Sequence, residues 1–263
     1  MSSHSESRPQ PMLAPCRTLD TLEPVAWLHA GWADFLRAPR QSLIYGLGLW
    51  LLCLLVAGLT WVTGGYVLLL ALLSGFVFIG PVLAIGLYSV SCQLERGLRP
   101  RLGLCLAEGR RQLGNALVFS VILLVVFLVW ARAASMVHVF FPVEGHPDFA
   151  DLLLFLGVGS AVGSVFAAVA FSASAFALPM LLDRRVDTVT AVLTSVHAVL
   201  RNPRAMAVWA GIIVLGVMIC LLTGLLAVPV VMPVLGYATW HGYRRAIDPH
   251  DWPEQPKLPM ETA

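Results

Sequence analysis

The sequence predicts an all-α integral membrane protein with six transmembrane helices. Three observations support this fold class: few charged residues, long uncharged stretches, and basic residues that collect on one side of the predicted membrane. Of the 263 residues, 58% are hydrophobic and only 12% are charged, and the mean hydropathy is +0.81. Soluble domains carry about 25% charged residues. The composition therefore excludes a soluble globular domain, a disordered chain and a nucleic-acid-binding protein.

Four stretches without any charged residue define the predicted spans. They are 54, 20, 31 and 39 residues long and cover 41–94, 112–131, 152–182 and 205–243. A bilayer core of about 30 Å needs roughly 20 residues of helix, so the two longest stretches each hold two spans, divided at Gly64-Gly65 and at Gly224. The six spans are predicted near 43–62, 66–94, 113–134, 152–182, 205–222 and 225–243.

The orientation of these spans follows from the basic residues. Of the 17 Lys and Arg residues, 16 fall before the first span, after the last one, or in the connections that share their side. The connection between the third and fourth spans carries Glu144, Asp148 and Asp151 instead. The positive-inside rule therefore places both termini in the cytoplasm. The expected organisation is a disordered N-terminal tail (1–24), a membrane domain (25–245) and a cytoplasmic C-terminal tail (246–263).

Three short amphipathic segments precede the first, third and fifth spans. Their apolar faces are formed by Leu28, Trp32, Phe35 and Leu36, by Leu102, Cys105, Leu106 and Leu113, and by Val186, Val189, Leu193, Val196 and Leu200. Such segments are too polar to span, and they favour helices in the cytoplasmic interface, next to anionic lipid headgroups. The predicted architecture is thus three hairpin-like pairs of spans, each preceded by an interfacial helix. This repeat is common in transporters, but duplication alone also produces it.

Several motifs together resemble a known family. They include Gly80-Pro81-x-Leu83-Ala84, Leu94-Glu95-x-Gly97, Pro179-x-Leu181-x-Asp183 and the ending Gly236-x-Ala238-Thr239-Trp240-His241-x-Tyr243-Arg244. In combination, over roughly residues 25–245, they resemble the bacterial integral membrane family called domain of unknown function 2189. That family has no established activity, so the resemblance implies membership and membrane location, with no catalytic residues to transfer.

Some relatives in that family carry a cytochrome c oxidase label, which the histidines test. Oxidase chemistry needs buried histidines that ligate haem iron and copper. Only His138 and His241 lie near predicted spans, and the topology places them at opposite faces of the membrane. We therefore expect no metal or other cofactor. The chain also lacks HExxH, GxSxG and phosphate-loop motifs, so we expect no enzymatic activity.

Arg132 is the one basic residue outside the cytoplasmic groups. An ionisable residue within a span is by default a candidate functional residue. Because Arg132 ends an uncharged stretch, its side chain could simply reach the outer headgroups. The alternative is a ligand-binding contact to an anion or substrate, paired with Glu144, Asp148 or Asp151.

Proline and glycine mark the candidate kink and packing positions. Gly80-Pro81, Pro179, Pro229 and Pro233 interrupt predicted spans or their ends, and each proline removes a helical hydrogen bond. Gly159 and Gly163 form a Gly-x-x-x-Gly motif, which lets helices approach closely. The fourth span is therefore expected to be a central packing helix or a subunit interface.

The leading functional hypothesis is a non-enzymatic protein of the bacterial inner membrane that scaffolds or supports envelope components. Its expected partners are the bilayer and a membrane protein or a second copy of the chain. The alternative is a transporter or channel for a small solute, which predicts a polar cavity near the middle of the membrane. An accessory subunit of a respiratory oxidase is a more distant third hypothesis.

Overall fold

The computed structural model describes residues 13–63, 66–140 and 149–256, with only the backbone for 60, 63, 66–79, 137–140, 149–152 and 155. The described residues form helices and no strand, apart from two isolated bridges. This confirms the predicted all-α class. The helices are α1 (Glu23–Arg37), α2 (Pro39–Thr63), α3 (Tyr66–Glu95), α4 (Leu102–Arg111), α5 (Leu113–Phe140), α6 (Phe149–Ser174), α7 (Ala177–Asp183), α8 (Thr188–Arg201), α9 (Pro203–Leu222) and α10 (Val228–Ala246).

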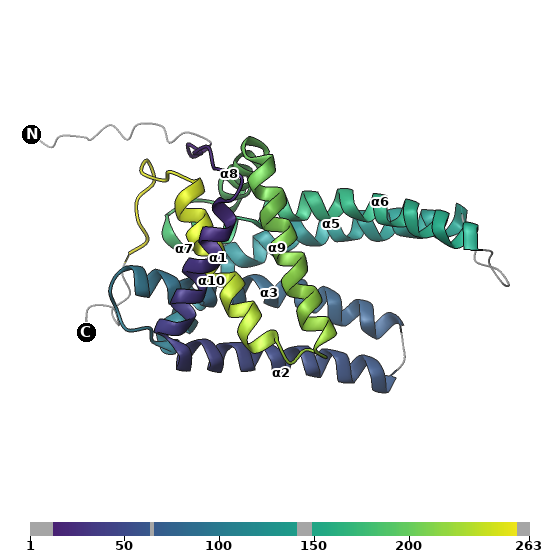
Figure 1. Cartoon of the computed structure of the whole chain (residues 1–263), viewed down its shortest axis with the longest axis horizontal. Helices are drawn as coiled ribbons and strands as arrows, with labels where there is room; N and C mark the ends of the chain where they lie inside the picture. The colour runs from purple at the N-terminus through teal and green to yellow at the C-terminus, as the bar shows by residue number, and fades with distance from the viewer. Residues whose placement is uncertain (1–12, 64–65, 141–148, 257–263) are drawn as a thin grey trace, which may run out of the picture.

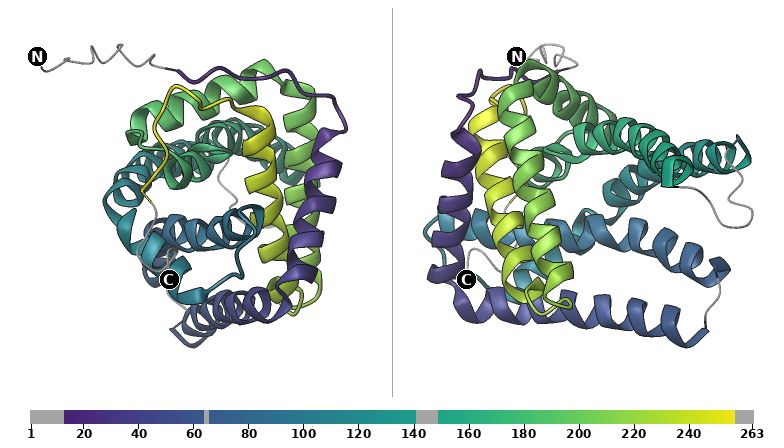
Figure 2. Two further views of the ribbon diagram at one scale, coloured as in Figure 1. Left: turned by 90° about the vertical axis from the view of Figure 1, so that its left-hand side faces the viewer. Right: turned by 45° about the vertical axis from the view of Figure 1, so that its right-hand side comes forward.

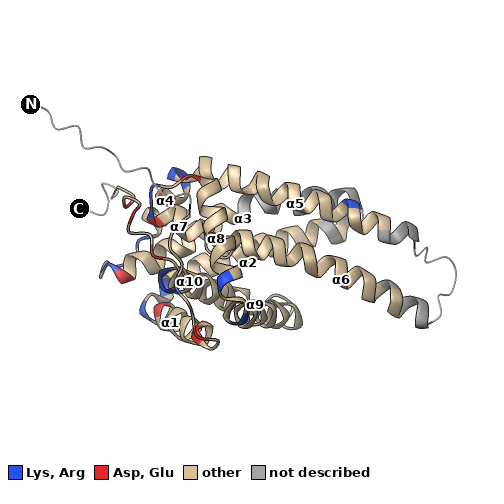
Figure 3. Ribbon diagram, turned by 90° about the horizontal axis from the view of Figure 1, so that it is seen from above, with Lys and Arg blue, Asp and Glu red and all other residues tan. Residues whose placement is uncertain are grey.

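Two pairs of long helices extend from one end of the molecule, and the charged residues gather at the other end. Figures 1 and 2 show α2 with α3 and α5 with α6 projecting in the same direction. Figure 3 shows that blue and red residues concentrate around α1, α4, α8 and the end of α10, while the long helices are almost free of them. We call the charged end the head of the molecule. A bilayer accommodates the long helices, whereas the head needs water or headgroups.

Within the described residues, four helices are long and apolar enough to cross a membrane: Pro39–Leu59, Leu113–Met136, Leu156–Asp183 and Pro203–Leu222. They correspond to the first, third, fourth and fifth predicted spans. The predicted span 66–94 coincides with α3, whose first half lies outside the described side chains. The predicted span 225–243 coincides with α10, which is not among the four. The count of six spans is therefore not confirmed.

Helix α10 differs from a lipid-facing span because it is buried by other helices. It packs on α1, α2, α3 and α9, and together with α9 and α1 it runs steeply across the long pairs (Figures 1 and 2). Two glycines permit this packing: a Cβ on Gly31 would lie 2.7 Å from the backbone nitrogen of Ala238, and one on Gly46 would overlap the Pro229 backbone. The hairpin of α9 and α10 is therefore not parallel to the other two pairs.

Helices α1, α4 and α8 form where the three amphipathic segments were predicted, and part of the apolar stripe expected on α8 lies at the surface, although Val186 is buried. Val189, Leu193 and Leu200 are exposed, whereas Thr194 and Ser195 are buried against the rest of the protein. A helix that points small polar groups inward and large apolar groups outward is suited to a lipid surface. Its first turn is capped by Asp187, whose carboxylate accepts a hydrogen bond from the Thr190 backbone.

Helix α1 keeps part of its predicted apolar face at the surface. Of Leu28, Trp32, Phe35 and Leu36, Trp32 and Leu36 are 46% and 60% exposed, whereas Phe35 is buried. The face that packs on α10 contains Trp27, Gly31, Asp34 and Phe35. Two close contacts fix the rotation of α1 about its axis, Gly31 against the α10 backbone and Trp27 against Gly242 of α10.

The predicted fourth span is broken into α6 and α7 at residues 175–176, just before Pro179. Pro179 lies in the first turn of α7, where helical N–H groups have no partner within the helix. The backbone N–H of Phe176 donates to the Ser195 hydroxyl, which in turn donates to the Ser172 carbonyl. Ser195 of α8 therefore satisfies the Phe176 N–H and the Ser172 carbonyl, which the break leaves without helical partners. Backbone polar groups within a membrane need such partners.

The described segments before α1 and after α10 pack on the head. The N-terminal tail was expected to be disordered to residue 24, yet Ala14 and Cys16 are buried, and the Leu19 backbone donates to the Asn202 side chain. The backbone N–H of Arg17 donates to the carbonyl of Ala246, which ties this segment to the end of α10. Residues 1–12 lie outside the described residues. The described part of the N-terminal tail is thus an ordered strap.

Candidate functional site

Three charged residues that end the long uncharged stretches meet in the head. Glu95 closes α3, Asp183 closes α7, and Arg244 lies near the end of α10. The Arg244 guanidinium is 3.0 Å from Glu95 Oε1 through Nε and 3.5 Å from Asp183 Oδ2 through Nη1. Partial burial of Arg244 lowers its pKa, but the carboxylates of Glu95 and Asp183 outweigh this effect and raise it. Arg244 therefore stays charged and joins the ends of three helices.

Two aromatic residues of α10 complete this cluster. The Tyr243 hydroxyl donates to Asp183 Oδ2 at 2.9 Å, and the Trp240 indole N–H donates to Glu95 Oε2 at 2.8 Å. Both side chains are buried, so each acidic residue receives a hydrogen bond from a fixed donor as well as an ion pair. Such charge-assisted bonds are stronger than bonds between neutral groups.

The C-terminal segment after α10 closes over the same cluster. Arg184 forms a 3.0 Å ion pair with Asp183, and its Nη1 donates to the carbonyl of Trp252 at 3.1 Å. The Gln255 backbone N–H donates to the carbonyl of Asp183, and its side-chain amide donates to that of Arg184. Because the Trp252 ring is also buried, this segment is a second strap that is anchored at several points. We call these charged, aromatic and strap residues the head cluster.

A polar cavity of about 450 Å³ lies beside the head cluster. It is lined by Cys92, Glu95, Arg96, Leu98, Asp183, Trp240, Arg244 and Glu254. The lining mixes three carboxylates with two guanidinium groups, and all three carboxylates take part in ion pairs. The cluster is therefore suited to holding helix ends together. Among the described residues, no group of three or more His, Cys, Asp and Glu side chains could hold a metal ion.

A second ionic contact in the head joins α1 to α10. The buried carboxylate of Asp34 lies 2.7 Å from His241 Nε2 and 3.6 Å from Arg37 Nη1. Sequence reasoning placed His241 at the cytoplasmic end of the last span but gave it no partner. The contact shows that Asp34 faces the protein.

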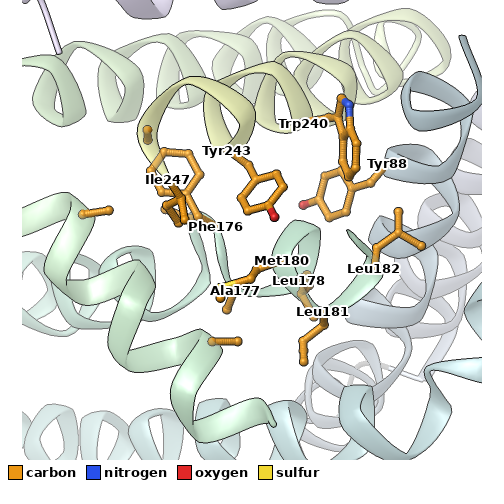
Figure 4. Close-up of a cluster of buried hydrophobic side chains, with 14 of the residues drawn as sticks. Tyr88, Phe176, Ala177, Leu178, Met180, Leu181, Leu182, Trp240, Tyr243 and Ile247 are labelled. Carbon is orange, nitrogen blue, oxygen red and sulfur yellow. The ribbon is translucent and has the colours of Figure 1, made fainter. Parts of the chain in front are cut away.

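Below the head cluster, a layer of tightly packed side chains separates the head from the long helices. Figure 4 shows Leu178, Met180 and Leu181 of α7 facing Tyr88 of α3 and Tyr243 of α10. Each of these side chains is less than 9% exposed. The polar cavity therefore does not continue between these residues into the region of the spans.

A separate, mainly apolar cavity of about 380 Å³ lies on the other side of that layer. It is an open groove between α3, α5, α6, α7, α9 and α10, and its lining includes Tyr88, Phe119, Leu123, Phe171 and Trp209. No charged residue lines it. A transporter with a polar site at mid-membrane depth would have polar or charged side chains at this position.

The predicted ligand residue Arg132 is exposed on α5, away from the head cluster. Glu144 and Asp148, two of its three proposed partners, lie outside the described residues, as does the side chain of Asp151. The structure therefore brings Arg132 together with none of the head-cluster residues.

The candidate kink positions differ in whether they interrupt a helix in the structure. Helix α3 continues through Gly80 and Pro81, and both residues line the apolar cavity. Pro179 accompanies a helix break, Pro229 lies in the first turn of α10, and Pro233 is inside that helix without ending it. Pro229 thus occupies a position that needs no N–H donor.

The Gly-x-x-x-Gly motif of α6 does not form a close helix crossing in the described structure. A Cβ on Gly159 would meet no atom within 4 Å, and one on Gly163 would lie 3.9 Å from Trp130 Nε1. The closest approaches involve Gly31 and Gly46 instead, and the central packing helix is α10. The role of the motif as a subunit interface stays a prediction.

The head cluster itself was missed by sequence reasoning, although a signal was present. Glu95, Asp183 and Arg244 each fall within a motif that carried the family resemblance, and each ends an uncharged stretch. From the sequence, these three residues indicate only where the predicted spans end. Their shared position at span ends on one side of the membrane could have indicated that they meet.

Comparisons with known proteins support the membrane assignment. Residues 68–183 match the model of a family described as "Predicted integral membrane protein (DUF2189)". The match contains α3 from Leu68 onward through α7, and therefore Tyr88, Glu95 and Asp183. It confirms the resemblance over these residues, a shorter range than the sequence motifs suggested. Neither the curated proteins nor the solved structures gave a match.

Proposed function

Because residues 68–183 match a family of integral membrane proteins, we propose that this chain is a non-enzymatic, multi-pass scaffold of the bacterial inner membrane. In this proposal the head lies at the cytoplasmic face, and the long helices present apolar surfaces to lipid, to a membrane-protein partner or to a second copy. The main support for the proposal is the head cluster. Its carboxylates form ion pairs that hold the helix ends and the C-terminal strap together, which is a structural role.

The surface of the long helices supports this role. Leu51 and Leu55 on α2, Val125 and Leu128 on α5, and Val165 on α6 are all more than half exposed. Apolar exposure of this extent within spans is satisfied either by lipid or by another membrane protein. A rigid head that holds two apolar hairpins apart is a suitable platform for assembly.

The interfacial contacts of the head fit a cytoplasmic membrane surface. The exposed apolar stripe of α8 adjoins Arg201 and Arg204, which are also exposed. Leucine and valine side chains can insert at the headgroup boundary while arginines contact anionic headgroups. The proposed lipid partner is therefore a bilayer with anionic headgroups on the cytoplasmic side.

The orientation can be tested with alkaline phosphatase fusions, because this enzyme is active only outside the cytoplasm. We expect activity from a fusion after Pro147 and none from fusions after Arg99, Arg201 and Lys257. Basic residues flank the last three sites, and the positive-inside rule retains them in the cytoplasm. Activity after Arg201 would contradict a cytoplasmic head and the proposed topology with it.

The scaffold role can be tested against transport in the same preparation. We expect liposomes that contain the purified protein to pass small anions no faster than empty liposomes. We also expect photo-crosslinkers at Leu154 and Val165, both exposed on α6, to give one defined product in native membranes. A crosslinker at Trp252, which is buried in the head, is the matched control and should give none.

Three results would overturn this proposal. Anion flux that falls when Arg132 is replaced by alanine would establish the transporter alternative. Haem absorbance that persists through detergent purification would favour the oxidase-subunit hypothesis. Absence of any defined crosslinked product at the α6 positions would contradict a scaffold.

A further inference from the structure

The apolar cavity below the head cluster has one polar feature, the hydroxyl of Tyr88. Tyr88 lies on α3, lines the cavity and is only 8% exposed. Its hydroxyl makes no hydrogen bond to any described residue. The other tyrosines with described side chains all donate one: Tyr45 to the Leu83 carbonyl, Tyr237 to Ser42 and Tyr243 to Asp183. The Tyr88 oxygen is not among the fully buried side-chain atoms that lack a partner, so it keeps accessible surface and can donate to a bound molecule.

The remaining polar groups of the lining are already used by the protein. The Ser174 hydroxyl donates to the Ala170 carbonyl and the Thr239 hydroxyl to the Leu235 carbonyl, each within its own helix. The other lining side chains are aliphatic or aromatic, including Phe119, Leu123 and Phe171. A molecule in this cavity would therefore meet hydrocarbon on most sides and one unpaired donor, which describes a ligand with a long apolar part and a single acceptor.

The position of the cavity limits how such a molecule could arrive. The packed layer of α7 side chains against Tyr88 and Tyr243 closes it toward the head (Figure 4). Residues of α3, α5, α6 and α9 line the rest of this open groove. Because α5, α6 and α9 are candidate membrane spans, the groove is accessible to a molecule dissolved in the membrane.

The depth of Tyr88 matches a particular part of a lipid. Tyr88 precedes Glu95, at the charged end of α3, by seven residues, which is about 10 Å of helix. The headgroup region of a bilayer is roughly 5–8 Å thick on each side. The Tyr88 side chain thus lies close to the boundary between headgroups and hydrocarbon, where the ester groups of phospholipids are found.

We propose that this cavity is a lipid-binding site, which holds one acyl chain of a membrane phospholipid while the Tyr88 hydroxyl donates a hydrogen bond to the carbonyl oxygen of its ester. The partly exposed side chains of Leu123 and Phe171 contact the chain. This site is independent of the scaffold role. The site concerns a lipid bound between the helices, whereas the scaffold role concerns the proteins that bind to the outer surface of the helices.

The test compares two lipids that differ only at the proposed acceptor. Purified full-length protein is mixed with diacyl phosphatidylglycerol or with its diether analogue of the same chain length, and the retained lipid is measured by mass spectrometry. We expect the diacyl lipid to bind roughly 2- to 10-fold more tightly, the range that one hydrogen bond supplies. The Tyr88→Phe variant should lose this preference, since it keeps the ring and loses only the donor.

Matched variants separate the site from general effects. Tyr45→Phe removes a buried hydroxyl that already has a partner on α3 and should keep the preference. Leu123→Trp fills the cavity and should reduce retention of both lipids, whereas Val121→Trp, at a position that is 51% exposed on the same helix, should leave retention unchanged. Circular dichroism and gel filtration verify folding of each variant.

Equal binding of the two lipids by the unmodified protein would overturn the contact to the ester carbonyl, and so would a preference that survives in Tyr88→Phe. Unchanged retention in a folded Leu123→Trp variant would overturn the cavity as the site. Each of these results leaves the crosslinking and flux outcomes for the scaffold unaffected, so the two proposals fail separately.

Discussion

Replacing Asp183 by asparagine is expected to destabilise the protein by about 3–5 kcal/mol, the usual consequence of removing one partner from a buried ion pair. The Asp183 and Arg184 side chains are 7% and 9% exposed. Without the carboxylate, Arg184 loses its closest counter-charge, and Tyr243 and Arg244 lose a charged acceptor. Asparagine preserves the shape, so the change reports mainly on charge. Unfolding in detergent micelles, followed by circular dichroism, measures the effect.

The matched control for this variant is Glu254→Gln. Glu254 also pairs with Arg184, at 3.6 Å, but its side chain is 67% exposed. An exposed ion pair contributes about 0–1 kcal/mol, so the control should unfold almost as the unmodified protein does. Equal losses in the two variants would show that burial of the head cluster does not determine its strength, and would weaken its assignment as the element that holds the helix ends.

The second large effect is expected at Gly46, where α2 crosses the start of α10. A Cβ at this position would lie 2.7 Å from the carbonyl carbon of Pro229 and would overlap its oxygen. Both contacts are with backbone, which cannot rotate away, so Gly46→Ala must push the two helices apart. We expect a loss of about 1–3 kcal/mol, as for other overpacking substitutions, measured by the same unfolding assay.

Gly48 provides the control two residues further along the same helix. A Cβ there would meet no atom within 4 Å. Alanine is the better helix former by about 0.5–1 kcal/mol, so Gly48→Ala should be neutral or slightly stabilising. The two substitutions are chemically identical, and their difference isolates the helix crossing. Similar values for both would mean that α10 does not approach α2 as closely as the structure shows.

The uncharged stretches predicted the helices well because the bilayer imposes a length requirement on each span. Pro39–Leu59, Leu113–Met136, Leu156–Asp183 and Pro203–Leu222 lie where four of the six spans were expected. The turn at Gly224, where φ is +59°, also lies where glycine predicted it. Local rules were sufficient here, since a hydrophobic run and a residue that tolerates positive φ act without reference to distant parts of the chain.

The same local rules did not reveal how α10 and α1 pack. Composition made 225–243 look like a lipid-facing span, because aromatic and small residues such as Tyr237 and Ala238 are apolar enough for lipid. In the structure both residues are fully buried by other helices. Hydropathy does not distinguish burial in lipid from burial in protein, so the pattern could not reveal which helix occupies the centre.

The membrane location, the positions of four spans and the gathering of charge at one end of the molecule were determined by the sequence by itself, since each depends on the hydropathy of contiguous residues. Only the tertiary structure decided which face of α1 is buried and that Glu95, Asp183 and Arg244 meet in one head cluster. It also decided that Tyr88 is left without a partner beside an apolar cavity. These features arise from contacts between helices far apart in the chain, where glycine positions and ion pairs set the packing.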